Sequence, residues 1–229
     1  MRLFVAITPP PAVLDELETR VAVLRPEWPA LRWTGQPAWH VTLAFLGEVG
    51  EHTAAALGPR LERAAHRHPG LPLSIAGAGA FPAPGRARVL WTGISGDRRA
   101  LEALARSVAA GARRAGAPPP DEGRRFRPHL TLARCREPAD VGRLVEAVAG
   151  YAGAVWTAAE IHLIRRRPGD PGSKPRYETV GTWLLRLSWR RATPLPRLIP
   201  AARHVQHRSP VAPHGAVRPL AQPAADLAV

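Results

Sequence analysis

The stretch "RPHLTLARC", Arg127 to Cys135, repeats a phrase that stands earlier in the chain, in "HVTLAFLG" at His40 to Gly47. Both read His-x-Thr-Leu-Ala, with polar and apolar residues alternating as in a strand that has one covered face. Successive side chains of a strand point to opposite faces, so each histidine shares a face with the threonine two residues later. Each phrase therefore predicts a strand that presents one imidazole and one hydroxyl group away from the core.

Strand and helix signals alternate around these two phrases. Short apolar runs bounded by Pro and Gly predict strands, and apolar residues at helical spacing predict helices. Each half of this region holds one His-x-Thr strand, followed by a helix and further strands. The pattern predicts an α+β fold of two pseudo-symmetric lobes, in which helices pack outside antiparallel sheets. We expect helices over residues 12–25, 51–68, 97–116 and 138–151, and strands over 2–7, 31–34, 40–47, 71–81, 87–95, 129–134, 154–166 and 176–187.

The two phrases together supply the groups for phosphate-ester chemistry. If a pseudo-twofold axis relates the lobes, His40, Thr42, His129 and Thr131 converge on one cleft between them. One neutral and one protonated imidazole can act together as base and acid near neutral pH. Threonine hydroxyls can bind phosphate oxygens. The set suits hydrolysis of a cyclic phosphodiester, in which a base deprotonates water and an acid protonates the departing sugar oxygen, and it needs no metal.

Two arginines and two aromatic residues near the phrases are further candidates. Arg127 and Arg134 can make charge-assisted contacts with phosphate. By simple alternation Arg127 shares the face of His129, whereas Arg134, five residues later, falls on the other face. Phe45 and Trp39 are candidates for stacking on a base, but by the same alternation they point away from His40. Another tryptophan, Trp91, is expected in the core.

Composition narrows the class of protein. The chain has 229 residues, which is enough for one domain or two small lobes with a real core. No run approaches 18 apolar residues and the N-terminus lacks a signal-peptide pattern, so we expect no membrane span and a cytoplasmic location. The single cysteine, Cys135, excludes an internal disulfide. The net charge of +14 favours a polyanionic partner, nucleic acid first.

The last forty residues differ from the rest. Residues 190–229 contain seven prolines, no aromatic residue, and six arginines against one aspartate, which is +5 of the net charge. No hydrophobic period survives there. We expect a disordered, basic, proline-rich tail after a folded domain over residues 1–189.

Three alternatives to an active site are also compatible with the repeat. A duplicated strand can keep its sequence for packing alone, although packing does not explain polar His and Thr at matching positions. A zinc site of His40, His129 and Cys135 would lack a fourth ligand and close ligand spacing. A module that binds RNA or a nucleotide without turnover would have no need for two titrating groups.

The two phrases resemble motifs of the 2H phosphoesterase superfamily. Three further stretches add to the resemblance, namely "MRLFVAI", "AFPAPGRARVLWTGI" and "RYETVGTWLL". Within this superfamily they are similar to the RNA 2′,3′-cyclic phosphodiesterases, also called 2′-5′ RNA ligase-like or LigT-like proteins, over roughly residues 1–187. The resemblance implies a bilobal fold with the active cleft between the lobes. It also implies that a terminal 2′,3′-cyclic phosphate on RNA is opened to a 2′-phosphate without a cofactor.

The resemblance implies roles as well. His40 would be the proton donor and His129 the proton acceptor, and Thr42 and Thr131 would orient the phosphate. It further implies a reversible 2′-5′ ligation of RNA, with tRNA halves as candidate partners. We expect a monomer. A small cyclic nucleotide is the alternative substrate, since the same groups would serve it.

Overall fold

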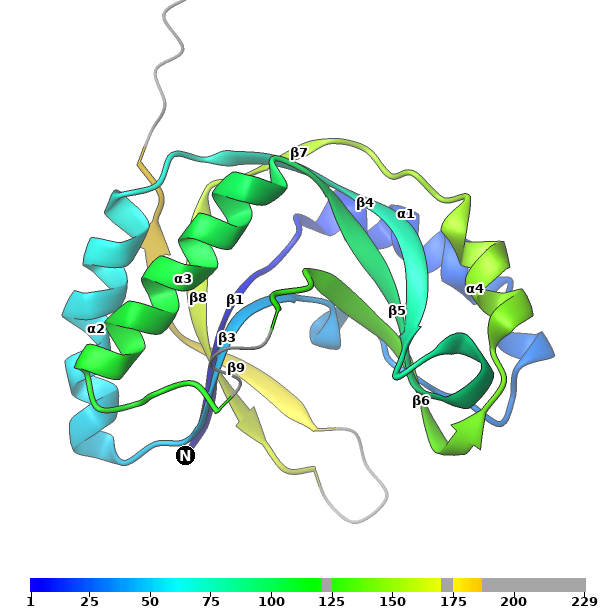
Figure 1. Ribbon diagram of the computed structural model, residues 1–229, viewed down its shortest axis with the longest axis horizontal. Helices are drawn as coiled ribbons and strands as arrows, with labels where there is room; N and C mark the ends of the chain where they lie inside the picture. The colour runs from blue at the N-terminus through cyan, green and yellow to red at the C-terminus, as the bar shows by residue number, and fades with distance from the viewer. Residues whose placement is uncertain (121–124, 170–174, 187–229) are drawn as a thin grey trace, which may run out of the picture. The chain divides into compact units, whose positions relative to one another are not determined.

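Two antiparallel sheets form the framework of the structure. The computed structural model describes residues 1–120, 125–169 and 175–186 (Figure 1). The tail expected at 190–229 lies outside the described residues. Every pairing between named strands is antiparallel, as the sequence predicts. The α+β fold class is therefore confirmed.

The first sheet has the strand order β3-β1-β8-β9. Its strand β1, Arg2–Ile7, sends three apolar side chains into the main core and Phe4 and Ala6 to the opposite face. Both faces of β1 are covered, which explains why "LFVAI" is apolar throughout and does not alternate. The other strands are β3 (Val41–Glu48), β8 (Glu160–Arg167) and β9 (Arg176–Leu184).

The second sheet has the order β2-β6-β5-β4-β7. It contains the second His-x-Thr phrase in β6, flanked by the long hairpin of β4 and β5. Its strands are β2 (Arg32–Trp33), β4 (Leu71–Phe81), β5 (Ala87–Gly96), β6 (His129–Ala139) and β7 (Trp156–Ala158).

The two sheets do not correspond to the two halves of the chain. Strands β4 and β5 precede the second phrase yet pair with it, while β8 and β9 follow it yet complete the first sheet. The single strand expected over residues 154–166 is in fact two, since β7 pairs in the second sheet and β8 in the first. The order of elements along the chain predicted the lobes but misassigned these strands, because hydrophobic patterns do not say which strands pair.

The helices cover the outer faces of the sheets (Figure 1). Helices α2 and α3 pack on each other and against the first sheet, and α4 packs on β4. Helix α3 begins where Asp97 accepts a hydrogen bond from the Ala100 backbone N–H at 2.9 Å, a typical N-cap. The expected helix over 138–151 is shorter, because β6 continues to Ala139. The bounds are α1 (Pro11–Ala22), α2 (Glu51–His66), α3 (Arg98–Arg114) and α4 (Gly142–Ala149), with short 3-10 turns at Arg25–Glu27, Gln36–Ala38 and Pro84–Arg86.

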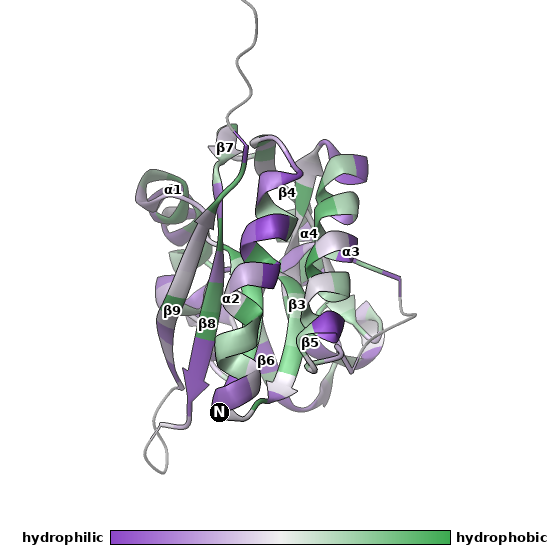
Figure 2. Ribbon diagram, turned by 90° about the vertical axis from the view of Figure 1, so that its left-hand side faces the viewer, coloured by the Kyte–Doolittle hydropathy of each residue, from purple (hydrophilic) through white to green (hydrophobic). Residues whose placement is uncertain are grey.

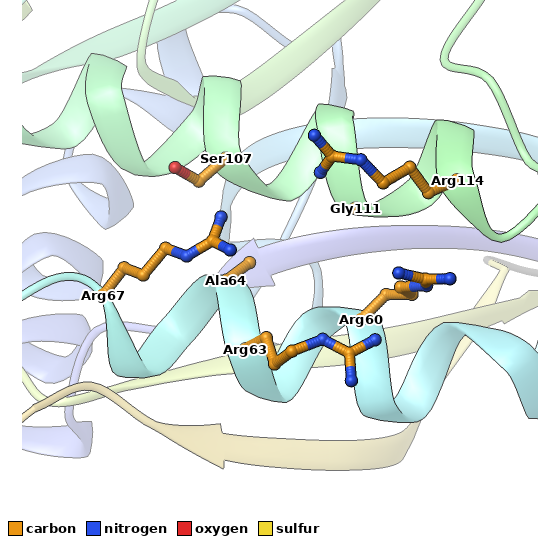
Figure 3. Close-up of a pocket in the computed structure, with 7 residues that line it drawn as sticks. All are labelled: Arg60, Arg63, Ala64, Arg67, Ser107, Gly111 and Arg114. Carbon is orange, nitrogen blue, oxygen red and sulfur yellow. The ribbon is translucent and has the colours of Figure 1, made fainter.

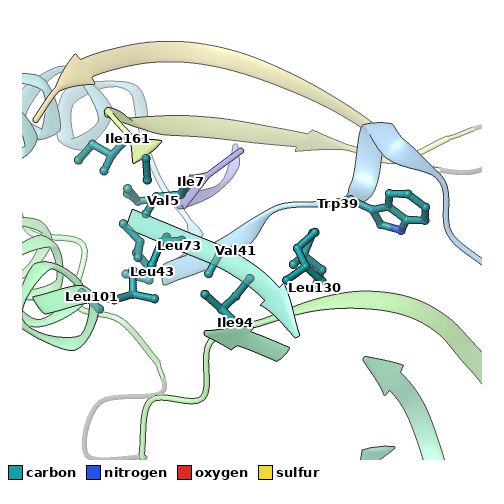
Figure 4. Close-up of a cluster of buried hydrophobic side chains, with 14 of the residues drawn as sticks. Val5, Ile7, Trp39, Val41, Leu43, Leu73, Ile94, Leu101, Leu130 and Ile161 are labelled. Atoms are coloured by element: carbon teal, nitrogen blue, oxygen red, sulfur yellow. The ribbon is translucent and has the colours of Figure 1, made fainter. Parts of the chain in front are cut away.

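One continuous core joins the sheets. Val5 and Leu43 of the first sheet and Leu73 and Leu130 of the second belong to the same buried cluster (Figure 4). In Figure 2 the strands β3 and β5 are largely hydrophobic, whereas hydrophilic stretches lie along α2. No helix within the described ranges is long and apolar enough to cross a membrane.

Candidate active site

A bulge in β3 changes which side chains share a face with the first phrase. Across from β1, Thr42 pairs with Ala6, Ala44 with Val5 and Phe45 with Phe4, which leaves Leu43 as an extra residue. An extra residue on one strand reverses the alternation beyond it. Phe45 therefore lies on the same face as Thr42, and its side chain is 48% exposed. The prediction that Phe45 points away from His40 is wrong.

The same irregularity occurs in the second phrase. Across from β5, Thr131 pairs with Trp91, Ala133 with Leu90 and Arg134 with Val89, so that Leu132 is the extra residue. Arg134 consequently shares the face of Thr131, contrary to the expectation from simple alternation. The two phrases are thus alike in structure as well as in sequence. On the face of the threonines their equivalent positions differ in one place, where Phe45 in the first phrase corresponds to Arg134 in the second.

Aromatic rings enclose His40. Its imidazole lies 4.6 Å from the ring of Phe4, centroid to centroid, and meets Tyr177 at 5.3 Å, edge to face. Phe4, Ala6 and Ile164 form a small buried cluster beneath it. Burial lowers the pKa of His40 to about 4, and the charges of His129 and Arg134 act in the same direction.

His129 has a matching aromatic enclosure and one hydrogen bond. Its ring meets Phe81 edge-on at 5.1 Å and lies 6.0 Å from Trp91. Its Nδ1–H donates to the Arg127 carbonyl oxygen at 2.7 Å, because a carbonyl can only accept. Burial lowers the pKa of His129, the hydrogen bond opposes this shift, and Arg134 adds to it. The neutral ring therefore keeps its Nε2 lone pair available for a proton.

Trp91 forms a wall of this site, although its sequence context predicted a core position. Its indole lies over β4 at Gly79, where an added Cβ atom would come within 2.3 Å of the ring. Only glycine leaves room for the ring at that place. The indole Nε1–H of Trp91 is buried, and no described group accepts its proton.

Arginine charge gathers at this face of the second sheet. Arg134 acts on the pKa of both histidines, so it lies near both. Arg32 stands directly opposite Arg134 in the ladder between β2 and β6, and cross-strand partners share a face. Sequence reasoning missed Arg32, although the strand that carries it was expected. Arg127 is exposed, and it meets the site through the carbonyl oxygen that is bonded to His129.

The structure thus brings together the two halves of the predicted constellation. His40 and His129 interact electrostatically, and each shares a face with its threonine. Phe4, Tyr177, Phe81 and Trp91 join them, and none of the four was expected in the site. The signal for Phe4, Phe81 and Trp91 was present in the apolar runs of β1, β4 and β5, but those runs equally predict a core, and Tyr177 stands between two charged residues at the start of β9. Within the described segments, no three His, Cys, Asp or Glu side chains form a group that could hold a metal ion, and this includes the candidate trio with Cys135.

Comparison with known families agrees with this geometry. Residues 9–170 match the model of a family described as the 2′-5′ RNA ligase superfamily. The chain belongs to this superfamily. A protein of Aeropyrum pernix named RNA 2′,3′-cyclic phosphodiesterase is 35% identical over 127 residues, which is 56% of this chain and 70% of the relative.

Solved structures of the superfamily share the fold. The apo crystal structure of E. coli LigT matches 81% of this chain and 97% of its own, with a TM-score of 0.62 and 29% identity. LigT in complex with 3′-AMP matches 80% of this chain and 96% of its own, with a TM-score of 0.60 and 29% identity.

Proposed function

We propose that residues 1–189 hydrolyse a terminal 2′,3′-cyclic phosphodiester on RNA to a 2′-phosphomonoester. The observation that carries the proposal is the matched setting of the two imidazoles: each is held between aromatic rings, His129 is oriented by its bond to the Arg127 carbonyl, and Arg134 shares the face of His129 and Thr131. The name of the Aeropyrum relative and the 3′-AMP bound to LigT support an RNA end as substrate. Acid–base chemistry of this kind needs no metal.

In the proposed reaction His129 acts as base and His40 as acid. Nε2 of His129 takes a proton from water while the water oxygen bonds to phosphorus. The bond from phosphorus to the 3′-oxygen breaks, and His40 gives its proton to that oxygen. The hydrogen bond from His129 Nδ1 supports the base role, because it leaves Nε2 as the unprotonated nitrogen. The histidines end with exchanged protonation states, and solvent restores them.

In the proposed reaction, binding of the substrate brings His40 into the protonated form that an acid needs. With a pKa of about 4, His40 is neutral in the empty site at pH 7 and cannot act as an acid. A negatively charged phosphate next to both imidazoles raises their pKa values. The proton that His40 donates is therefore held only when the phosphate is bound.

Neighbouring groups would bind the substrate. Thr42, Thr131 and Arg134 hold the phosphate oxygens, and Arg127 contributes through the carbonyl that orients His129. The exposed ring of Phe45 offers a surface on which the terminal base can stack. The same acid and base could also ligate RNA: a 5′-hydroxyl of a second RNA would replace water, lose its proton to His129 and bond to phosphorus, while the bond to the 3′-oxygen breaks and His40 protonates that oxygen, which leaves a 2′-5′ bond.

The test is turnover of a short RNA with a 2′,3′-cyclic phosphate end, in the presence of EDTA. We expect a 2′-phosphate product from the wild type and none from His40→Ala or His129→Ala, with RNA binding retained in both. His52→Ala is the matched control, because His52 is exposed on α2 and α2 packs on the opposite face of the first sheet. Turnover that survives in either motif variant would refute the acid–base pair.

Two further results would identify the alternatives. Turnover of small cyclic nucleotides, but not of the RNA, would indicate a small-molecule phosphodiesterase. RNA binding without turnover of either substrate would indicate a binding module.

A further inference from the structure

Four arginines gather between α2 and α3, away from the candidate active site. Arg60 and Arg63 come from α2, Arg67 directly follows α2 as its C-cap, and Arg114 comes from α3 (Figure 3). The residues that line the hollow between them include no carboxylate. The hollow has a volume of about 170 Å³, and Ala64, Ser107 and Gly111 complete its lining.

Helical spacing puts these arginines on one face. Residues three and seven positions apart on a helix lie on the same side, so Arg60, Arg63 and Arg67 form a row, whereas Glu62 falls on the opposite side. The helices approach closely beneath the row, since a Cβ atom at Gly111 would lie 3.2 Å from the Arg60 carbonyl oxygen. Small residues therefore form the floor of a groove, and long cationic side chains form its rims.

The groove concentrates positive charge that no carboxylate of the described residues pairs with. Guanidinium groups stay protonated at any physiological pH, so the four repel one another. Among the described carboxylates, none forms an ion pair with these four, although other arginines do so, such as Arg25 with Glu18 and Arg106 with Glu102. A ligand with several negative charges would relieve the repulsion.

We propose that this groove binds the phosphodiester backbone of RNA at a second contact surface, separate from the active site. From Arg60 to Arg67 the row is about 10 Å long at 1.5 Å per residue. A nucleic acid strand carries a phosphate about every 3.4 Å along its axis, so the row spans about three or four phosphates. Arginine forks match phosphate oxygens in geometry as well as in charge. The choice of RNA, among polyanions, rests on the proposed function.

The groove and His40 lie on opposite sides of the first sheet, so the proposal predicts different effects on long and short substrates. Helices α2 and α3 pack on the face of the first sheet that carries the main core, whereas His40, Phe4 and Tyr177 lie on the other face. A mononucleotide bound at His40 cannot contact the groove, and only a longer RNA can occupy both places. The groove therefore affects long substrates and leaves small ones unchanged.

The experiment compares two double variants of the full chain. Arg63→Gln with Arg67→Gln removes two charges from the groove, and Arg99→Gln with Arg143→Gln removes two exposed charges elsewhere. Binding of single-stranded RNA with a 3′-hydroxyl end is measured against salt. We expect roughly tenfold weaker binding at low salt for the groove variant, with a salt slope smaller by about 1.4, since each lost contact with a single strand removes about 0.7. The control should change little.

Turnover assays with short and long substrates test the groove separately from the proposed hydrolysis. If the wild type hydrolyses a 2′,3′-cyclic mononucleotide, the groove variant should do so equally well, while its KM for a long RNA with a cyclic end rises. An RNA with a 3′-hydroxyl end carries no cyclic phosphate and is not a substrate. Its binding therefore tests the groove even if the chain hydrolyses nothing. Folding is checked by thermal unfolding, where loss of like charges should leave the Tm unchanged or raise it.

Three results would overturn the proposal. Equal RNA affinity and salt slope in the groove and control variants would mean a merely solvated surface. Weakened binding of inorganic phosphate, with RNA binding unchanged, would mean a small-anion site. Failure of the wild type to bind 3′-hydroxyl RNA at low salt would exclude a backbone contact.

Discussion

The single positive charge of Arg134 acts on both motif histidines. A substitution of Arg134 therefore has two effects that can be measured, one on the pKa values of the histidines and one on substrate affinity. Its guanidinium lowers the pKa of both His40 and His129 in the empty site, and in the proposed complex it faces the phosphate. The same charge thus disfavours the protonated acid before binding and stabilises the substrate after binding. Removal of this charge should therefore alter the pH dependence and the substrate affinity together.

We predict that Arg134→Gln moves the pH profile of kcat/KM upward. Loss of the positive charge lets both imidazoles hold protons at higher pH, because burial alone then lowers their pKa values. The KM should rise about tenfold or more, as expected for the loss of a charge-assisted hydrogen bond. Rates measured from pH 4 to 8 test this, with Arg134→Lys as a variant that keeps the charge. An unmoved profile in the Gln variant would contradict the role.

The exposed ring of Phe45 carries a second prediction. Phe45→Ala should raise the KM for RNA about 5- to 100-fold, since base–aromatic stacking contributes about 1–3 kcal/mol. The kcat should change little, because the ring does not reach the reacting atoms in the proposed mechanism. Phe45→Tyr keeps the ring and serves as the control. Equal KM values for all three proteins would remove Phe45 from the substrate site.

At the scale of elements, the bulges in β3 and β6 determine what the site contains. Each follows its threonine by one residue, and each turns the side chain three positions after that threonine toward the site. His40, Thr42, His129 and Thr131 could be predicted because they precede the bulge, where alternation holds. Phe45 and Arg134 could not be oriented, because a bulge is visible only in the register between two strands.

The packing of Trp91 over β4 can be tested at this scale. Gly79→Ala places a Cβ atom where the ring now lies, so either the ring or the strand must move. We expect a loss of about 1–3 kcal/mol in unfolding free energy, typical of overpacking, and a loss of activity through displacement of Trp91 toward His129. Chemical denaturation and turnover measure the two effects.

A second substitution controls for this result. Combining Gly79→Ala with Trp91→Leu should recover stability relative to the single variant, since the smaller side chain removes the clash. A Gly79→Ala protein as stable and as active as the wild type would show that the close contact has no consequence.

For the whole molecule, two sheets supply one site, and burial between aromatic rings keeps its imidazoles neutral. A pKa of about 4 for folded His40 lies below the usual 6.5. The unfolded chain therefore binds more protons than the folded chain between these values. The resulting stability is present above pH 6.5 and is lost as the pH falls toward 4.

We predict that the unfolding free energy declines over that range by up to about 3 kcal/mol from His40 alone. His40→Gln should flatten the decline, because no group at that position then titrates. Urea unfolding at a series of pH values gives the comparison, with His52→Gln on the exposed part of α2 as the control. Parallel curves for wild type and His40→Gln would show that His40 is not buried in its neutral form.

The sequence by itself determined the class of fold and predicted the candidate catalytic groups. The repeated His-x-Thr-Leu-Ala predicts two imidazoles and two hydroxyls for the site, and local periodicity predicted most strands and helices, since periodicity depends on neighbouring residues only. The tertiary structure alone decided that β8 and β9 complete the first sheet, that Phe45 and Arg134 face the site, and that four rings enclose the histidines. These features depend on pairing between strands that lie far apart in the chain. The free energy of that pairing depends on both strands at once, so the local pattern of one strand does not predict it.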